Sequence, residues 1–301
     1  MEKIKGVIFD IDGVLEFQGS VYPGAIETVD ALRGRGIALR FLTNSTLKSR
    51  ASCTAKLREA GFQVFYDEVI TASYATAVYL GKLKPRSCWI MLEREGLDEF
   101  RDFDQDTENP EYIVVGDNRS RFDFEHMNKA LRLLLGGAKL IGMIPELVDT
   151  SPGEAELNVG SWVGMLERAS GVKATYVGKP NAHVFELALR SMGLGKDEVV
   201  MVGDRVSTDI KGAKDFGMRA VLLRTGEFEE PDLASGVEPD FVFDSIQEVL
   251  SVFEPSGTGR AEETGHRRGH RDGLLIKDRC TSIIRARDSC LSSGERRRKG
   301  L

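Results

Sequence analysis

Two aspartates that directly follow a short apolar segment constrain this chain most. Residues 7–9 (Val-Ile-Phe) are too few for a buried helix and are rich in strand formers, so they predict the end of a strand buried on both faces. Asp10 and Asp12 come next, and alternate residues of an extended chain point the same way. Gly13 then lets the chain turn. Because ligands bind at the carboxyl ends of parallel strands, the pair predicts a divalent-cation site. The alternative is an Asp-Gly turn with solvated carboxylates.

Strand and helix patterns alternate along the rest of the chain. Apolar residues at helical spacing predict a helix over 25–35, and the apolar segment 37–42 predicts a second strand. The same reasoning predicts strands at 67–71, 88–92, 112–116, 138–143, 174–177, 198–202, 219–223 and 240–243, and helices at 48–60, 73–80, 122–135, 160–169, 181–192, 208–216 and 245–253. This alternation is typical of a parallel α/β sheet.

The order of these elements predicts two domains and a tail. We assign residues 1–82 and 174–255 to a core domain and residues 83–173 to a second, smaller α/β domain inserted into it. Residues 256–301 are rich in Arg, Gly and Ser and have few apolar clusters, so we predict a disordered basic tail.

Composition and charge exclude several classes of protein. The 301 residues are 41% hydrophobic and 29% charged, which fits a soluble globular protein. Residues 256–301 contain 12 Lys+Arg and 6 Asp+Glu, a net charge of +6, so the −6 of the whole chain leaves −12 on residues 1–255. An acidic body argues against nucleic acid as the partner. The sequence has no apolar run of about 18 residues, so no membrane span is predicted.

Two further features indicate a cytoplasmic location. The first residues lead straight into a predicted strand and do not resemble a signal peptide. Cys53, Cys88, Cys280 and Cys290 are scattered and form no CxxC pair, so neither a disulfide framework nor a zinc site is predicted.

Polar residues follow three more of the predicted strands. Thr43 and Asn44 come after the second strand, Lys179 after a short apolar strand, and Asp204 after a later one, with Asp209 five residues on. Taken singly, Thr43 and Asn44 could form a helix cap, and Lys179 could be an exposed loop lysine. Asp204 and Asp209 could be a turn and a helix cap. Together with the first two aspartates they supply a nucleophile, a second acid, phosphate-oxygen donors, a fixed cation and metal ligands. Phosphoryl transfer needs this set.

These motifs and their order resemble the haloacid dehalogenase (HAD) superfamily. The similar segments are Asp10-Ile11-Asp12-Gly13-Val14, Thr43-Asn44-Ser45, Gly178-Lys179-Pro180 and Gly203-Asp204-Arg205-Val206-Ser207-Thr208-Asp209. The insertion after the third strand is similar to that of subclass IIA, the NagD-type and nitrophenylphosphatase-like phosphatases. The resemblance covers residues 4–254. It implies the HAD fold, a Rossmann-like parallel sheet core with an inserted smaller α/β cap domain.

The resemblance also implies roles for individual residues. Asp10 would attack the phosphorus atom and form an aspartyl-phosphate. Asp12 would protonate the leaving alkoxide and then activate the water that cleaves this intermediate. Thr43 and the backbone of Asn44 would hold phosphate oxygens. Lys179 would neutralise charge on Asp10 and on the phosphate.

A magnesium ion is the implied cofactor. Asp10, the carbonyl of Asp12 and Asp204 would bind Mg²⁺, with Asp209 supporting them. The expected substrate is a small phosphorylated metabolite, a phosphomonoester, with no nucleic-acid or membrane partner. Self-association through the cap is left open.

Two cap segments depart from the family pattern, and two other functions remain as alternatives. Residues 143–146 read Met-Ile-Pro-Glu where many members carry Asn-x-Asp, and residues 152–156 read Pro-Gly-Glu-Ala-Glu near a usual glycine-rich loop. The substrate therefore cannot be transferred from any member. A dehalogenase-type hydrolase is one alternative, although its nucleophile loop normally lacks the second acid. A phospho-accepting or non-catalytic binding protein is the other.

Overall fold

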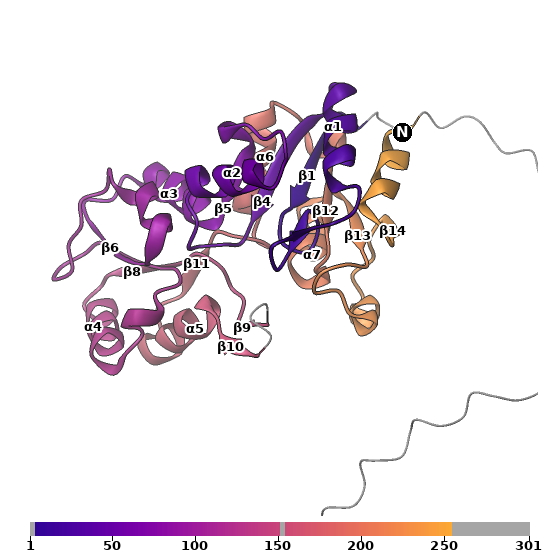
Figure 1. The fold of residues 1–301 in the computed structure, drawn as a ribbon. Coiled ribbons are helices and arrows are strands. Elements are labelled where there is room, and N and C mark those ends of the chain that lie inside the picture. Colours follow the sequence, from indigo (N-terminus) through magenta and orange to yellow (C-terminus); the bar gives the residue numbers. More distant parts are fainter. Residues whose placement is uncertain (1–3, 151–153, 255–301) are drawn as a thin grey trace, which may run out of the picture. The chain divides into compact units, whose positions relative to one another are not determined.

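The main structural element is a six-stranded parallel sheet (Figure 1). The computed structural model describes residues 4–150 and 154–254, which belong to one compact unit. The strands are β1 (Gly6–Asp10), β4 (Ala38–Thr43), β5 (Val69–Thr71), β12 (Val199–Gly203), β13 (Arg219–Leu223) and β14 (Phe241–Phe243). They lie in the order β14-β13-β12-β1-β4-β5, and every neighbouring pair is parallel. The predicted α/β fold with a parallel core sheet is confirmed.

Strand β1 lies inside the sheet and is buried on both faces. Val7, Ile8 and Phe9 are fully buried, as the continuous apolar run predicts. Ile8 belongs to one hydrophobic cluster, with side chains of α3 (Ala72–Leu83), α6 (Ala182–Met192) and α7 (Lys211–Phe216). Val7 and Phe9 belong to the other, with α1 (Ala25–Gly34), α2 (Arg50–Glu59) and the 3-10 helix Ile246–Phe253. The two faces of the sheet are thus covered by different helices.

A second parallel sheet lies between α3 and α6 in the sequence. It contains β6 (Cys88–Met91), β7 (Tyr112–Val115), β8 (Lys139–Gly142) and β11 (Ala174–Tyr176), in the order β11-β8-β7-β6. Helices α4 (Phe124–Leu135) and α5 (Val159–Ser170) accompany it (Figure 1). The described residues also contain two short antiparallel strand pairs, β2 (Glu16–Phe17) with β3 (Ser20–Val21), and β9 (Val148–Asp149) with β10 (Glu156–Leu157).

The expectation that the main sheet resumes at 174–177 was wrong. Strand β11 pairs with β8 and is the last strand of the second sheet. Its side chains are only half-buried, as expected of a strand with one neighbour. The chain therefore returns to the first sheet only after residue 176. The division of the described residues into a core and a cap domain stays a prediction, because they form one compact unit.

The helix-cap reading of Thr43 and Asn44 was also wrong. Helix α2 begins at Arg50, and the side chain of Ser49 accepts a hydrogen bond from the backbone N–H of Ser52 at its amino end. Six residues separate the end of β4 from α2, so the polar side chains after the strand are available for other contacts.

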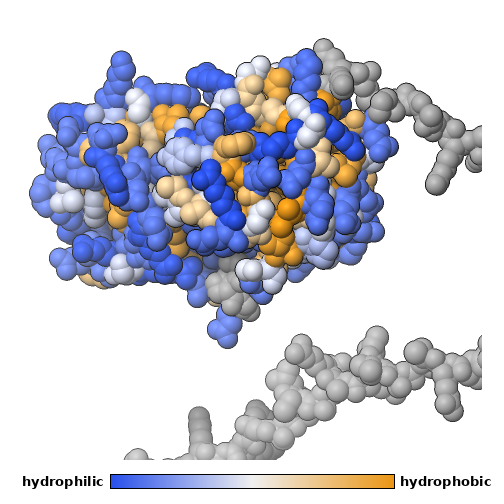
Figure 2. All heavy atoms as spheres, turned by 45° about the horizontal axis from the view of Figure 1, so that its top comes forward, coloured by the Kyte–Doolittle hydropathy of each residue, from blue (hydrophilic) through white to orange (hydrophobic). Residues whose placement is uncertain are grey.

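Polar residues predominate on the face of the molecule in Figure 2, with apolar residues in separate small areas. Within 4–150 and 154–254, no helix has both the length and the apolar composition needed to cross a bilayer. The predicted disordered tail, residues 256–301, lies outside the described residues, as do residues 152 and 153 of the predicted cap loop.

Replacing Phe41→Ala should lower the free energy of unfolding by about 3–5 kcal/mol, because it removes a fully buried ring and leaves a cavity. Phe41 is fully buried on β4, and its ring centroid lies 6.3 Å from that of Phe9. Urea denaturation followed by circular dichroism measures the change. Phe124→Ala is the matched control, since that ring is 87% exposed and its loss should change stability by no more than about 0.5 kcal/mol. Equal effects of the two substitutions would contradict the packing described.

Candidate active site

The carboxyl ends of three adjacent strands bring most of the predicted residues together. Asp10 ends β1, Thr43 ends β4, and Asp204 follows directly after β12. Because β12, β1 and β4 are neighbours and parallel, their ends lie at one edge of the sheet. Lys179 comes from a different place, the connection between β11 of the second sheet and α6.

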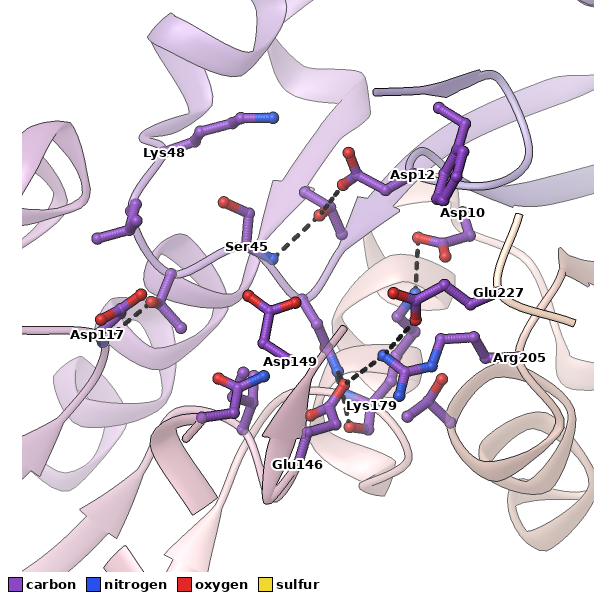
Figure 3. Close-up of a pocket in the computed structure, with 18 of the residues that line it drawn as sticks. Asp10, Asp12, Ser45, Lys48, Asp117, Glu146, Asp149, Lys179, Arg205 and Glu227 are labelled. Atoms are coloured by element: carbon purple, nitrogen blue, oxygen red, sulfur yellow. Dashed lines mark hydrogen bonds and ion pairs between the residues drawn. The ribbon is translucent and has the colours of Figure 1, made fainter. Parts of the chain in front are cut away.

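A buried lysine lies between two carboxylates. The Nζ atom of Lys179 lies 2.7 Å from Oδ1 of Asp10 (Figure 3). The same atom lies 2.7 Å from Oδ1 of Asp209, and the Lys179 side chain is 2% exposed. Burial alone would lower the pKa of Lys179, but the two carboxylates raise it above its ordinary value. Burial raises the pKa of Asp10, an effect that the Lys179 ammonium opposes. The lysine is therefore a fixed cation beside the predicted nucleophile, and the exposed-loop reading of Lys179 was wrong.

The oxygens of Asp10 are in different environments. Oδ1 faces Lys179 and also accepts a hydrogen bond of 2.8 Å from the backbone N–H of Ile11. Both contacts fall on the same oxygen, so Oδ2 remains for a ligand. The fixed Oδ1 sets the orientation of the whole carboxylate.

Asp204 and Asp209 complete a cluster of three buried acids. One oxygen each of Asp10, Asp204 and Asp209 can be chosen so that all three lie within 4.8 Å of one another. Burial and the neighbouring charge of Asp209 raise the pKa of Asp204 to about 7. Gly203 makes this arrangement possible, since a Cβ atom there would lie 2.2 Å from the Cβ of Asp209. The cluster supplies oxygen ligands of the kind that Mg²⁺ prefers.

Asp12 lies apart from this acid cluster. Its side chain is exposed, and its Oδ2 accepts a 3.1 Å hydrogen bond from Oγ1 of Thr43. The same Thr43 oxygen accepts a 3.0 Å hydrogen bond from the backbone N–H of Ser45. The Asp12 carboxylate at the edge of the site is thus oriented by Thr43 and is still reached by solvent.

The side chain of Asn44 connects the two sheets. Its Oδ1 accepts a 2.9 Å hydrogen bond from the backbone N–H of Lys179, and its Nδ2 donates to the carbonyl oxygen of Lys179 at 3.0 Å. The same Nδ2 donates to Oε1 of Glu146, after β8, at 2.7 Å. Because a carboxylate can only accept, this contact fixes which end of the Asn44 amide faces the Lys179 N–H. Asn44 therefore holds the lysine loop in place.

Arg205 lies between two further carboxylates. Its Nη1 is 3.0 Å from Oε2 of Glu227 and 3.9 Å from Oε1 of Glu146, and the three side chains form a row beside Lys179 (Figure 3). Burial raises the pKa of Glu146, whose side chain is 9% exposed. These residues border a cavity of about 420 Å³ that also reaches Asp10, Asp12 and Lys179.

Sequence reasoning missed Glu146 and Glu227 as parts of this site. Segment 143–146 drew attention only as a departure from the family pattern, and no local pattern marks Glu227. Arg205 stood inside a recognised motif without an assigned role. Only the pairing of segments from both sheets brings the three side chains together.

Comparisons with known proteins agree with this geometry. The model of haloacid dehalogenase-like hydrolases matches residues 7–105, and a HAD-hydrolase-like model matches residues 176–249. The bovine phospholysine phosphohistidine inorganic pyrophosphate phosphatase is 35% identical over 259 residues, which are 83% of this chain and 94% of that protein. The chain belongs to the haloacid dehalogenase superfamily.

Two solved structures narrow the assignment within the superfamily. The p-nitrophenyl phosphatase from Archaeoglobus fulgidus has a TM-score of 0.78 and 32% identity, over 83% of this chain and 99% of that one. NagD from E. coli K-12 has a TM-score of 0.76 and 29% identity, over 82% and 98% of the two chains. These matches confirm the subclass IIA assignment. At the level of the family they also confirm the prediction of a hydrolase acting on phosphoric monoesters.

In this hydrolase, Lys179→Met should lower the free energy of unfolding by about 3–5 kcal/mol in metal-free buffer at neutral pH, because buried Asp10 and Asp209 would lose their counter-ion. Chemical denaturation measures the loss. Lys211→Met is the control, because Lys211 is half-exposed and pairs with Asp215 on the surface, a pair worth no more than about 1 kcal/mol. A Lys179→Met protein as stable as wild type would refute the electrostatic account of this site.

Proposed function

We propose that the protein is a magnesium-dependent phosphatase that hydrolyses a small phosphomonoester through an aspartyl-phosphate on Asp10. The observation that carries the proposal is the contact of Asp10 with buried Lys179, beside the acid cluster of Asp204 and Asp209. A nucleophile, a fixed cation and a set of oxygen ligands at one strand edge are what phosphoryl transfer requires.

Asp10 is the nucleophile in this proposal. Its Oδ2 attacks phosphorus in line with the leaving oxygen. The bond between phosphorus and the leaving oxygen breaks, and the phosphoryl group remains on Asp10. Lys179 and the backbone N–H of Ile11 hold Oδ1, so the attacking oxygen starts in a fixed position. The Lys179 ammonium also offsets the negative charge of the approaching phosphate. Thr43 and the backbone of Asn44 would contact phosphate oxygens.

Asp12 is the proton donor and acceptor in this proposal. It protonates the leaving alkoxide in the first half of the reaction. In the second half it takes a proton from the water that attacks phosphorus, and the bond to Asp10 breaks to release phosphate. Its exposed position and its hydrogen bond from Thr43 support this role, because the carboxylate is oriented and still reached by solvent.

The acid cluster fits a divalent cation. Oδ1 of Asp204 is buried and has no hydrogen-bond donor within the described residues, an arrangement that costs free energy unless a ligand is bound. Asp10 and Asp204 would hold Mg²⁺, together with the Asp12 carbonyl and with Asp209 in support. When bound, the ion would offset charge on the phosphate oxygens.

The cavity supports a small and polar substrate. Its volume is about 420 Å³, and most of the residues along it are charged or polar. A small phosphorylated metabolite suits such a site better than a macromolecule or an apolar ester. The lack of nucleic-acid and membrane partners and a cytoplasmic location remain predictions, and self-association through the cap remains open.

The direct test is hydrolysis of p-nitrophenyl phosphate by purified protein with and without Mg²⁺. Wild type should be active with Mg²⁺ and inactive with EDTA, and added Mg²⁺ should restore the rate. Asp10→Asn should abolish turnover while leaving the circular dichroism spectrum unchanged, since an amide is a poor nucleophile. An Asp10→Asn rate above a few per cent of wild type would sink the nucleophile assignment.

Asp12→Asn should reduce turnover by an amount that depends on the leaving group. Nitrophenolate leaves without a proton, whereas an alkoxide needs one, so the loss should be smaller for p-nitrophenyl phosphate than for an alkyl phosphate. Initial rates on the two substrates, each divided by the wild-type rate, give the comparison. Equal losses on both would contradict the acid role of Asp12.

Calcium should inhibit the magnesium-dependent rate. Ca²⁺ takes six to eight oxygens at about 2.3–2.6 Å, against six at about 2.0–2.1 Å for Mg²⁺. The larger shell can occupy both oxygens of Asp10 and leave none to attack. Titrating Ca²⁺ at fixed Mg²⁺ and measuring the rate tests this expectation. Full activity in Ca²⁺ alone would overturn it.

A further inference from the structure

The loop after β13 reaches the same strand edge as the four motifs. Three successive residues of this loop, 225–227, each make a contact there. Oγ1 of Thr225 donates a 2.6 Å hydrogen bond to the carbonyl of Gly13, and the backbone N–H of Glu227 donates one of 2.7 Å to Oδ2 of Asp204. Between them, the N–H of Gly226 donates to the hydroxyl of Tyr22 at 2.9 Å. The loop is thus attached both to the turn after Asp12 and to Asp204.

Two glycines allow this close approach. A Cβ atom on Gly226 would lie 2.4 Å from the Cα of Gly13 and 2.2 Å from Oδ2 of Asp204. A Cβ atom on Gly13 would lie 2.1 Å from the same oxygen. Both residues have positive φ, +59° for Gly226 and +90° for Gly13, which other residues rarely adopt. The Asp204 carboxylate therefore occupies a space that side chains at Gly13 and Gly226 would fill.

The hydrogen bond from the backbone N–H of Glu227 gives the two carboxylate oxygens of Asp204 different environments. Oδ2 accepts the backbone N–H, whereas the buried Oδ1 has no donor within the described residues. A carboxylate held by one oxygen and packed between two backbone segments cannot turn freely. Its other oxygen is then held in a single direction. One carboxylate oxygen of Asp204 lies within 4.8 Å of an oxygen of Asp10 and of Asp209.

We propose that segment 225–227 is a fifth active-site loop, whose residues position Asp204 to bind the divalent cation. The proposal rests on the proposed magnesium-dependent function. Thr225 and Gly226 are positioning residues in this proposal, because they contact Gly13, Tyr22 and Asp204 and would act through Asp204. A loop that only covered the strand end would leave the metal affinity unchanged when its attachment is weakened.

The first test compares Thr225→Val with Thr225→Ser. Valine has the shape of threonine but cannot donate to the Gly13 carbonyl, whereas serine keeps the hydroxyl. Isothermal titration calorimetry, with Mg²⁺ added to each full-length protein in the absence of substrate, measures the Mg²⁺ affinity directly. We expect Thr225→Val to weaken binding about fivefold, the effect of one lost hydrogen bond, and Thr225→Ser to bind like wild type. KM for substrate at saturating Mg²⁺ should stay unchanged.

The second test compares Gly226→Ala with Gly236→Ala. Both glycines have positive φ, +59° and +80°, so both substitutions strain the backbone. A Cβ on Gly236 meets nothing within 4 Å, whereas one on Gly226 would collide with Asp204. Gly226→Ala should therefore weaken Mg²⁺ binding by more than about tenfold, and Gly236→Ala should not.

The outcomes separate the two proposals. If wild type shows no Mg²⁺-dependent phosphatase activity, the proposed function fails. If wild type is active but Thr225→Val binds Mg²⁺ as wild type does, the fifth-loop proposal fails alone. Should Gly226→Ala fail to fold, the Thr225 pair still decides. Equal weakening by Thr225→Val and Thr225→Ser would also count against it, because the hydroxyl would then have no part in the effect.

Discussion

The site depends on one buried cation between two buried carboxylates. Taking the Lys179 ammonium and the carboxylates of Asp10 and Asp209 out of water costs several kcal/mol for each ion. The two contacts of 2.7 Å offset that cost only while all three side chains keep their positions. Three segments must therefore meet accurately: the end of β1, the turn before α6, and the π-helical turn Val206–Ile210. The same interaction orients Asp10, the proposed nucleophile, so the packing of this region and its proposed chemistry depend on the same contact.

The second sheet contributes to the site through Glu146. Its carboxylate accepts a hydrogen bond from Asn44, which in turn holds the backbone of Lys179, and it lies near Arg205. Arg205 also pairs with Glu227 from the loop after β13. Side chains of two sheets and several loops are thus joined in one polar network, whose buried members are stable only when each has a partner. A substitution at Glu146 can therefore alter the position of Lys179 through Asn44.

Local sequence patterns predicted where strands end, but they did not predict for every strand which of the two sheets it joins. The run before Asp10 is apolar on both faces, which only a strand inside a covered sheet explains, and β1 has this position. Segment 174–177 was also predicted to be a strand and was assigned to the core domain, yet it belongs to the other sheet, because pairing with β8 depends on distant residues that no local pattern contains. Likewise Thr43 and Asn44 resembled a helix cap, but α2 starts six residues later with Ser49 as its cap.

The sequence by itself determined the alternation of strands and helices, the polar residues after each strand and the family to which they belong. Spacing along the chain carries this information, because side-chain direction in a strand and capping at a helix end are local properties. Only the tertiary structure decided that Asn44 holds Lys179, that Glu146 and Arg205 come together, and that Gly226 packs against Asp204. These contacts join residues far apart in the chain, and their geometry follows from how two sheets and their loops pack.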